Sequence, residues 1–204
     1  MRWLTRLDPA GEVAYREAVR PLAGRIERAL GPEVLAIRSR PASWRRARAT
    51  WRRRVAAAIG DARRGTVFAL ADVRDCYGSI TPETLAGILG PDAAPAVAIL
   101  DELRAGGVRG LPVGPDPSAA LGNAVLARLD DAVRRAGATH VRWADDLVLW
   151  GHRGDVVAAM AALERTAGGL GLSLHDRKTR IVGDRAELAA ASLGARHSSI
   201  IAAP

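Results

Sequence analysis

Three aspartates are the residues of this chain whose type and spacing are best suited to chemistry. Asp145 and Asp146 are adjacent and lie between two short apolar runs, and Asp72 ends a separate apolar run. Adjacent ionised carboxylates resist leaving water unless a cation neutralises them. We therefore interpret Asp145 and Asp146 as metal ligands on the turn of a β-hairpin. A solvated turn fits the local sequence equally well, because aspartate favours turns.

The third carboxylate decides which metal we expect. If the strand that ends at Asp72 lies beside the hairpin, three carboxylates meet and form an oxygen-rich site. Such a site suits Mg²⁺, which keeps several waters and binds substrate phosphates. A pair of these ions stabilises the attacking and leaving oxygens of a phosphoryl displacement. We expect two Mg²⁺ ions, with Mn²⁺ as a substitute. Zinc has no competing site, since the cysteine is single and the four histidines are scattered.

Periodicity and capping signals place these acids in an α+β chain. The predicted helices cover 9–30, 42–60, 81–89, 94–105, 116–136 and 154–168. The predicted strands cover 67–71, the hairpin at 140–150, 172–174 and 179–182. This order predicts an antiparallel sheet with helices on one face. A second aspartate pair, Asp130 and Asp131, falls in the helix over 116–136, and we interpret it as helix surface without a metal.

Composition points to a globular protein with a polyanionic partner. The chain has 204 residues, 49% of them hydrophobic, and a net charge of +8. A pI near 11.1 indicates nucleic acid first. The single Cys76 excludes an internal disulfide and favours a reducing cytoplasm. The N-terminus lacks the apolar core of a signal peptide, and no apolar run is long enough for a membrane span, so we expect no membrane partner.

An arginine-rich helix is the candidate surface for that partner. Five of the arginines in the predicted helix over 42–60 lie on two flanks beside an apolar stripe: Arg45, Arg46, Arg48, Arg52 and Arg53. Guanidinium groups so arranged favour contact with the phosphates of a nucleic-acid backbone or a nucleotide. The alternative is an ordinary amphipathic helix with a charged exterior.

Four sequence blocks, in order and at suitable spacing, resemble the palm of a bacterial reverse transcriptase. The resemblance is to the branch of retron, group II intron and phage-defence enzymes, and it covers about 65–182. The blocks are DVRDCYGSI at 72–80, GLPVGPDPS at 110–118 with Asn123 downstream, RWADD at 142–146 and GLSLHDRKT at 171–179. In the third block the family more often has tyrosine where this chain has Trp143.

The resemblance implies a polymerase right-hand palm over 65–186. It also implies reduced, helical, Arg-rich fingers over 1–64 and a short tail over 187–204 in place of a thumb. The implied activity is RNA-directed DNA polymerisation: deoxynucleotides are added to a primer 3′-hydroxyl on an RNA template, and the primer is DNA or RNA. Without a thumb, holding the product requires a non-coding RNA, a partner protein or self-association. A role in phage defence follows from family association alone.

The resemblance also assigns roles to single residues. The implied metal ligands are Asp72, the Val73 carbonyl and Asp145, with Asp146 completing the acidic site. The implied nucleotide-binding residues are Arg74, Asp75, Cys76, Tyr77, Pro112, Val113 and Gly114. The Tyr77 ring is expected under the sugar, where it excludes a 2′-hydroxyl, although a core aromatic is the simpler interpretation. Ser118 and Asn123 are expected to lie under the nucleic acid.

Lys178 has an argument of its own. It is the one lysine among 30 basic residues. Arginine cannot release a proton in a protein, whereas lysine can when its pKa is lowered. A general acid for the pyrophosphate leaving group would therefore require lysine here. One lysine surviving by chance in an exposed strand is the alternative.

Two departures from the family leave questions open. Val113 stands where many relatives have glutamine, which removes a side-chain contact to the nucleotide. No clear finger motif precedes the palm, so the triphosphate-binding cations remain a choice among Arg38, Arg40, Arg45 and Arg48. Three other functions compete with templated synthesis: a palm that binds RNA or a partner without catalysis, template-independent or protein-primed synthesis, and a nucleotide cyclase.

Overall fold

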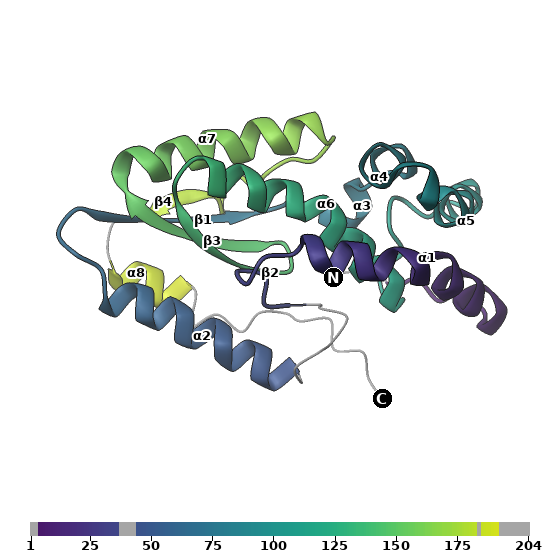
Figure 1. Cartoon of the computed structure of the whole chain (residues 1–204), viewed down its shortest axis with the longest axis horizontal. Coiled ribbons are helices and arrows are strands. Elements are labelled where there is room, and N and C mark those ends of the chain that lie inside the picture. Colours follow the sequence, from purple (N-terminus) through teal and green to yellow (C-terminus); the bar gives the residue numbers. More distant parts are fainter. Residues whose placement is uncertain (1–3, 37–43, 183–184, 192–204) are drawn as a thin grey trace.

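A four-stranded antiparallel sheet lies at the centre of the computed structural model, which describes residues 4–36, 44–182 and 185–191 (Figure 1). The strand order is β2-β3-β1-β4. The strands are β1 (Thr66–Asp72), β2 (Thr139–Trp143), β3 (Asp146–His152) and β4 (Arg180–Val182). The helices are α1 (Pro9–Ala29), α2 (Trp44–Gly60), α3 (Cys76–Ser79), α4 (Pro82–Leu89), the 3₁₀ turn η1 (Gly90–Ala93), α5 (Ala94–Ala105), α6 (Asp116–Arg135), α7 (Arg153–Gly169) and α8 (Arg185–Ala189). The predicted α+β class, with a palm-like antiparallel sheet, is confirmed.

Both faces of the sheet are buried. Successive side chains of a strand point to opposite faces, and Ala69 and Leu149 join the core that α6 and α7 cover. Phe68 and Val148 instead join a second core with Trp51 of α2. We expected helices on one face, whereas α2 and α8 also pack against the other (Figure 1). The reason is visible in β1, where apolar residues occupy both parities, as in strands buried on two sides.

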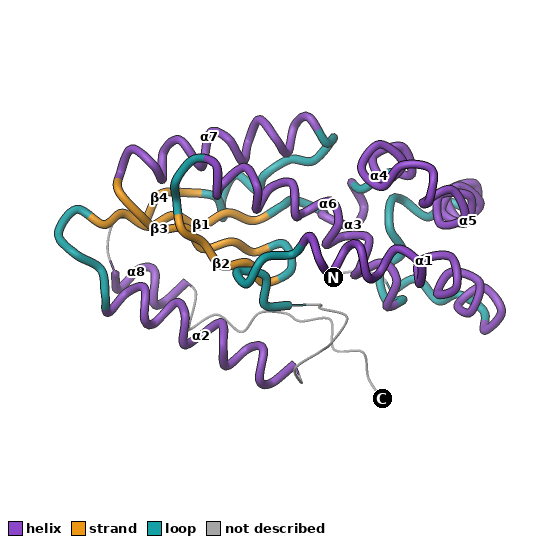
Figure 2. Tube along the Cα trace, in the orientation of Figure 1, coloured by secondary structure: helices purple, strands orange, loops and turns teal. Residues whose placement is uncertain are grey.

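The predicted helices form close to their predicted bounds, and side-chain caps mark the start of α1 and α4. Asp8 caps α1 by accepting a hydrogen bond from the Gly11 N–H at 2.7 Å, and Pro9 follows at the first helical position. Thr81 caps α4 in the same way. Figure 2 shows α1, α3, α4 and α5 gathered at one end of the molecule, beyond the strands.

The segment from Pro82 to Ala105 meets the length and hydropathy of a membrane-crossing helix, with a mean hydropathy of 1.2 over its most apolar part. It is not one straight helix. Gly90, with φ of 68°, ends α4, and η1 turns the chain so that α5 packs back on α4. The apolar residues of this segment thus belong to two short helices, α4 and α5, that pack against each other.

The first two helices are integrated with the sheet and its covering helices. α1 packs against α6 and α5, while α2 packs against β2 and α8. The predicted division at 64/65 into fingers and palm stays a prediction. Most of the predicted tail, residues 192–204, lies outside the described residues.

Candidate active site

Asp72 and Asp146 are directly opposite each other in the register of β1 and β3. By the alternation of strands, both side chains point to the face that Leu70 and Val148 share, which is the face covered by α2. Asp145 precedes Asp146 in the hairpin loop. The charges of Asp146 and Asp145 both act on the Asp72 carboxyl group. Acids from two distant segments therefore converge on one face of the sheet.

The hairpin turn carries Asp145 toward the end of β1. Two residues, Ala144 and Asp145, connect β2 to β3. Ala144 has φ of 54°, whereas Asp145 does not have positive φ. The Val73 N–H donates a hydrogen bond to the Asp145 carbonyl at 3.3 Å. The hairpin predicted from the sequence is confirmed, and its turn is joined to the chain just after Asp72.

Asp72 is only 5% exposed, and this burial raises the pKa of its carboxyl group. A hydrogen bond from Lys178 lowers this pKa, but contact with Asp146 raises it again, so that the net shift is upward. The Lys178 Nζ lies 2.8 Å from Asp72 Oδ2. The neighbouring carboxylates thus disfavour ionisation of Asp72, while the Lys178 cation favours it. A divalent ion bound here would relieve the repulsion between the carboxylates.

Lys178 is protonated and paired rather than poised to lose its proton. Its hydrogen bond to Asp72 raises the pKa of the ammonium group. The lowered pKa that we expected of Lys178 is therefore not found in this state. A raised pKa keeps the proton that a general acid must donate, and the catalytic role of Lys178 stays a prediction.

The segment that carries Lys178 is fastened to the end of β1. The His175 N–H donates to the Asp72 carbonyl at 2.8 Å, and the Asp72 N–H donates to Thr179 Oγ1 at 3.3 Å. Of the predicted strand over 172–174, the structure forms one bridge, between Leu174 and Val73. Thr179 belongs to the site's support, and sequence reasoning did not single it out.

Tyr77 borders a small hollow beside the hairpin turn. The residues that line the hollow are Tyr77, Ala119, Gly122, Asn123, Leu126, Ala144 and Asp145. The ring lies so close to α6 that a Cβ on Gly122 would be 3.2 Å from Tyr77 Cε1. The Tyr77 carbonyl accepts a hydrogen bond from the Leu111 N–H at 2.8 Å. Gly110, with φ of 61°, approaches this carbonyl so closely that a side chain there would collide with it.

The other predicted nucleotide-binding residues lie near Tyr77, and they differ in their exposure to solvent. Cys76 and Pro112 are buried, so neither side chain is open to a ligand in this conformation. Arg74 is half-exposed and pairs with Asp176. Asp75 has φ of 43° and accepts a hydrogen bond from Arg109 at 3.3 Å.

The loop that contains Val113 and Gly114 is hydrogen-bonded to the N-terminal segment. The Val113 carbonyl accepts a hydrogen bond from the Thr5 N–H at 2.7 Å. Gly114, the last of the predicted nucleotide-binding residues, is exposed with φ of 128°.

Two predicted nucleic-acid contacts lie in the core instead. The Ser118 side chain is fully buried and shares a hydrogen bond with the Tyr15 hydroxyl at 3.1 Å. Asn123 is 2% exposed, and its Oδ1 accepts from Arg142. Both polar groups are bonded inside the protein, so a direct side-chain contact of Ser118 with nucleic acid is excluded in this conformation. Asn123 reaches only the wall of the Tyr77 hollow.

The α2 arginines divide into exposed and inward groups. Arg46, Arg52 and Arg53 are exposed, whereas the side chain of Arg45 is not among those described. The Arg48 guanidinium lies over the Trp143 ring, 5.6 Å from its centre. Burial lowers the pKa of Arg48 and Arg52 lowers it further, while Asp146 acts in the opposite direction. Arg48 is therefore within electrostatic reach of the acidic site.

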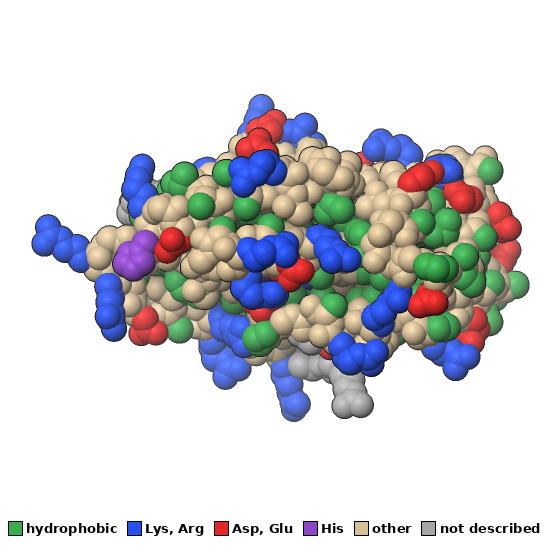
Figure 3. Space-filling model, turned by 45° about the horizontal axis from the view of Figure 1, so that its top comes forward, with side chains coloured by type: hydrophobic (Ala, Val, Ile, Leu, Met, Phe, Trp, Pro, Cys, Tyr) green, Lys and Arg blue, Asp and Glu red, His purple; other side chains and the backbone are tan. Residues whose placement is uncertain are grey.

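On the face that Figure 3 shows, basic side chains form several groups rather than one patch. Figure 3 shows several groups of them along the middle of the molecule, with many acidic side chains toward the end built by α1, α4 and α5. This distribution leaves α2 as one basic element among several.

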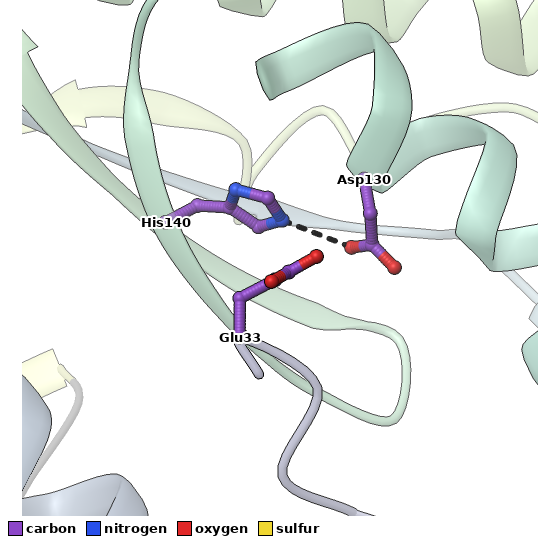
Figure 4. A group of neighbouring side chains, drawn as sticks. All are labelled: Glu33, Asp130 and His140. Carbon is purple, nitrogen blue, oxygen red and sulfur yellow. Dashed lines mark hydrogen bonds and ion pairs between the residues drawn. The ribbon is translucent and has the colours of Figure 1, made fainter. Parts of the chain in front are cut away.

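A second charged cluster lies behind the hairpin, and it corrects our interpretation of Asp130. Asp130 is 1% exposed rather than on the helix surface. Its carboxylate accepts hydrogen bonds from Arg142 Nε and from Arg142 NH2, the latter at 2.8 Å. His140 Nε2 lies 3.0 Å from Asp130 Oδ1 (Figure 4). Burial alone raises the pKa of Asp130, but Arg142 and His140 outweigh it and hold the pKa below its ordinary value.

This cluster has the donor atoms of a metal site but also an internal cation. Ligand atoms of Glu33, Asp130 and His140 lie within 4.8 Å of one another, close enough to share an ion. Among the described residues, the three acids at 72, 145 and 146 do not bring ligand atoms that close together. However, the Arg142 guanidinium already neutralises Asp130, and a metal ion beside it would be repelled. We therefore assign the cluster a structural role.

Comparisons with known proteins concern the fold alone. Telomerase from Candida albicans, in complex with a TWJ fragment of telomeric RNA, is similar with a TM-score of 0.49 and 13% identity over 86% of this chain. Apo telomerase from Candida tropicalis, truncated from its C-terminal domain, is similar with a TM-score of 0.47 and 12% identity over 82%. This chain spans 34% and 40% of those two chains. No protein-family model and no curated protein matches the sequence.

Proposed function

We propose that the chain is a Mg²⁺-dependent RNA-directed DNA polymerase that adds deoxynucleotides to a primer 3′-hydroxyl. The observation that carries the proposal is the pairing of Asp72 with Asp146 on one face of the sheet, beside Asp145. Two further residues that the family resemblance assigns to the site support the proposal: Lys178 bonds to Asp72, and Tyr77 lines a hollow together with Asp145. RNA template, primer and deoxynucleotides are the proposed partners.

The acidic residues fit a divalent cation by their chemistry. Asp72, Asp145 and Asp146 supply hard oxygen ligands, and the Val73 carbonyl is adjacent, so these groups would hold Mg²⁺. The ions would supply charge neutralisation at the reacting phosphate and activation of the primer hydroxyl. The chain's own residues position the reactants, and positioning with electrostatic stabilisation accounts for most of such catalysis.

The remaining roles belong to the surrounding cations and to Tyr77. Of the four candidate arginines, Arg38 and Arg40 lie outside the described residues and the Arg45 side chain is not described. We assign the triphosphate to Arg48, whose guanidinium lies over Trp143 and is influenced by Asp146. Lys178 would donate a proton to the pyrophosphate leaving group. The Tyr77 ring would exclude a 2′-hydroxyl from the hollow that it borders.

Primer extension tests the proposal. Purified protein is incubated with poly(rA)/oligo(dT), dTTP and Mg²⁺, and Asp145→Ala is compared with Asp131→Ala. The control removes an acid on α6 that pairs with Arg134 away from the site. We expect wild type and Asp131→Ala to extend the primer, and Asp145→Ala to be slower by at least about 100-fold. Equal extension by both variants would contradict the proposal.

One observation favours a second function, a palm that binds RNA without catalysis. The three acids do not bring their ligand atoms within the distance that the Glu33 cluster reaches. No extension by wild type, together with tight RNA binding that Asp145→Ala leaves unchanged, would select this function. Extension without template would instead select template-independent synthesis.

The biological setting rests on the family resemblance. We propose a cytoplasmic protein with a role in phage defence. Cells that carry the Asp145→Ala variant should lose protection in a phage challenge, whereas cells with Asp131→Ala should keep it. Unchanged protection with Asp145→Ala would separate defence from polymerisation.

A further inference from the structure

Arg142 is a fully buried arginine in the strand that leads to the hairpin turn. It lies between Val141 and Trp143, both of which are buried apolar residues. A buried guanidinium is costly unless its N–H groups are paired. The bonds that it makes therefore show what holds this part of β2 in place.

The Arg142 guanidinium connects α6 to the hairpin turn. Nε and NH2 donate to Asp130, while NH1 donates to Asn123 Oδ1 at 2.9 Å and to the Ala144 carbonyl at 2.9 Å. Asp130 and Asn123 are on α6, whereas Ala144 is the first residue of the turn. One side chain thus fixes the turn against a helix of the core.

The turn needs such support because its backbone is unusual. Ala144 has φ of 54°, a conformation that residues with a side chain seldom adopt. The next residue is Asp145, whose carbonyl accepts the Val73 N–H. A shift of the Ala144 carbonyl would therefore move Asp145 relative to the end of β1.

Arg142 supports the site without touching it. Asn123 and Ala144 both line the hollow beside Tyr77, but Arg142 does not. It lies behind the two residues that it bonds. This is the usual place of a residue that orients ligands through hydrogen bonds to their neighbours.

We propose that Arg142 is a positioning residue, which holds the Ala144 turn so that Asp145 faces Asp72. Its connection to metal binding rests on the proposed function, since Asp145 is a metal ligand only there. Asp130 and Asn123 are the anchors through which it acts, and His140 supports Asp130 from the other side.

The test compares Arg142→Lys with Arg134→Lys. Lysine keeps the charge but cannot reach Asp130, Asn123 and Ala144 with one planar fork. Arg134 contacts Glu33 at the edge of the same cluster with its guanidinium half-exposed, so it is a matched control. Two quantities are measured: the dissociation constant for Mn²⁺ alone, by electron paramagnetic resonance, and amide hydrogen exchange at Val73 relative to Leu149.

We expect Arg142→Lys to bind Mn²⁺ about 10- to 100-fold more weakly, as for other residues that orient metal ligands. Its Val73 amide should exchange faster while Leu149, in the middle of β3, reports any general loss of stability. Arg134→Lys should match wild type in both. The inference is overturned if Arg142→Lys and Arg134→Lys give the same Mn²⁺ affinity and the same Val73 exchange.

A third variant separates this inference from the proposed function. If Asp145→Ala binds Mn²⁺ as wild type does, the acids are not the metal site and the proposed function fails. Val73 exchange then decides the positioning role alone. Where Arg142→Lys does not fold, Asn123→Ala takes its place, because it removes one acceptor and keeps the pair with Asp130. The same two readouts then support or overturn the inference.

Discussion

The Lys178 ammonium lies 2.8 Å from the Asp72 carboxylate and is also influenced by the charges of Asp146 and Asp145. In the absence of a divalent ion, this pair neutralises part of the charge that Asp145 and Asp146 add. Ion binding would then redistribute the bonds of Asp72, which leaves Lys178 to interact with a substrate phosphate. The two functions that we assign to these residues are therefore coupled.

Replacing Lys178 should separate its charge from its proton. We expect Lys178→Met to slow single-nucleotide incorporation about 100-fold, within the usual range for a general acid. Lys178→Arg should be slowed similarly, because arginine does not give up a proton. Rapid-quench kinetics measures the step, with Arg177→Met as the control. Full activity in Lys178→Arg would reduce the role to charge alone.

Tyr77 should determine the sugar that the site accepts. Its ring packs on Gly122 and borders the hollow next to Asp145. We expect Tyr77→Ala to lose about 10- to 100-fold of the preference for deoxynucleotides, a range typical of steric discrimination. Tyr77→Phe keeps the ring and should keep the preference. The ratio of kcat/KM for dUTP and UTP, which differ only in the 2′-hydroxyl, measures this preference, and an unchanged ratio in Tyr77→Ala would contradict the role.

Asp130 should make the fold sensitive to acid. Its folded-state pKa is lowered, so its contribution to the free energy of unfolding is complete above the unfolded-state pKa of about 4. That contribution is lost as the pH falls through the lower, folded-state pKa. At pH 7, Asp130→Asn leaves Arg142 buried with less compensation and should cost about 3–5 kcal/mol.

Urea unfolding between pH 3 and pH 7 measures this effect. The difference between wild type and Asp130→Asn should shrink below about pH 4, where Asp130 becomes protonated in the unfolded state while it is still ionised in the folded state. The partly exposed Asp131 gives the control, since Asp131→Asn should cost less than about 1 kcal/mol. Equal costs for the two variants at pH 7 would contradict the buried network.

The exposed arginines of α2 should contribute to RNA binding through charge. We expect the triple variant of Arg46, Arg52 and Arg53 to glutamine to bind single-stranded RNA more weakly. Its salt dependence should also be shallower, by about 0.7 in the logarithmic slope for each phosphate that the variant no longer neutralises.

A control variant with the same change in net charge replaces Arg16, Arg20 and Arg104, on α1 and α5, by glutamine. Fluorescence anisotropy at several salt concentrations compares the two variants. Identical slopes would mean that overall charge, and not α2, binds the RNA.

The sequence predicts the acidic site better than its support. The strand before Asp72 and the hairpin at Asp145 are local patterns, and pairing them needs only one antiparallel register. The sequence of β1 also contains a signal for the second core, because Phe68 and Ala69 are adjacent and both apolar. That pattern indicates burial on two faces.

The network behind the hairpin could not be predicted with the same ease. An aspartate pair on a helix is usually solvated, and Asp130 is buried only because Arg142 reaches it from another element. One signal was present: Arg142 stands between two apolar strand residues, where a charge needs a partner. Which residue supplies that partner depends on tertiary packing, and one sequence does not encode it in any local pattern.

The pairing that sets Asp72 opposite Asp146 also governs when the acidic site can form during translation. β1 leaves the ribosome early, but its partner β3 and the segment that bears Lys178 emerge much later. Contacts of such long sequence separation form late in folding. A nascent chain that ends before Val182 lacks part of the sheet, so premature termination should release polypeptides with an incomplete sheet around the acidic site.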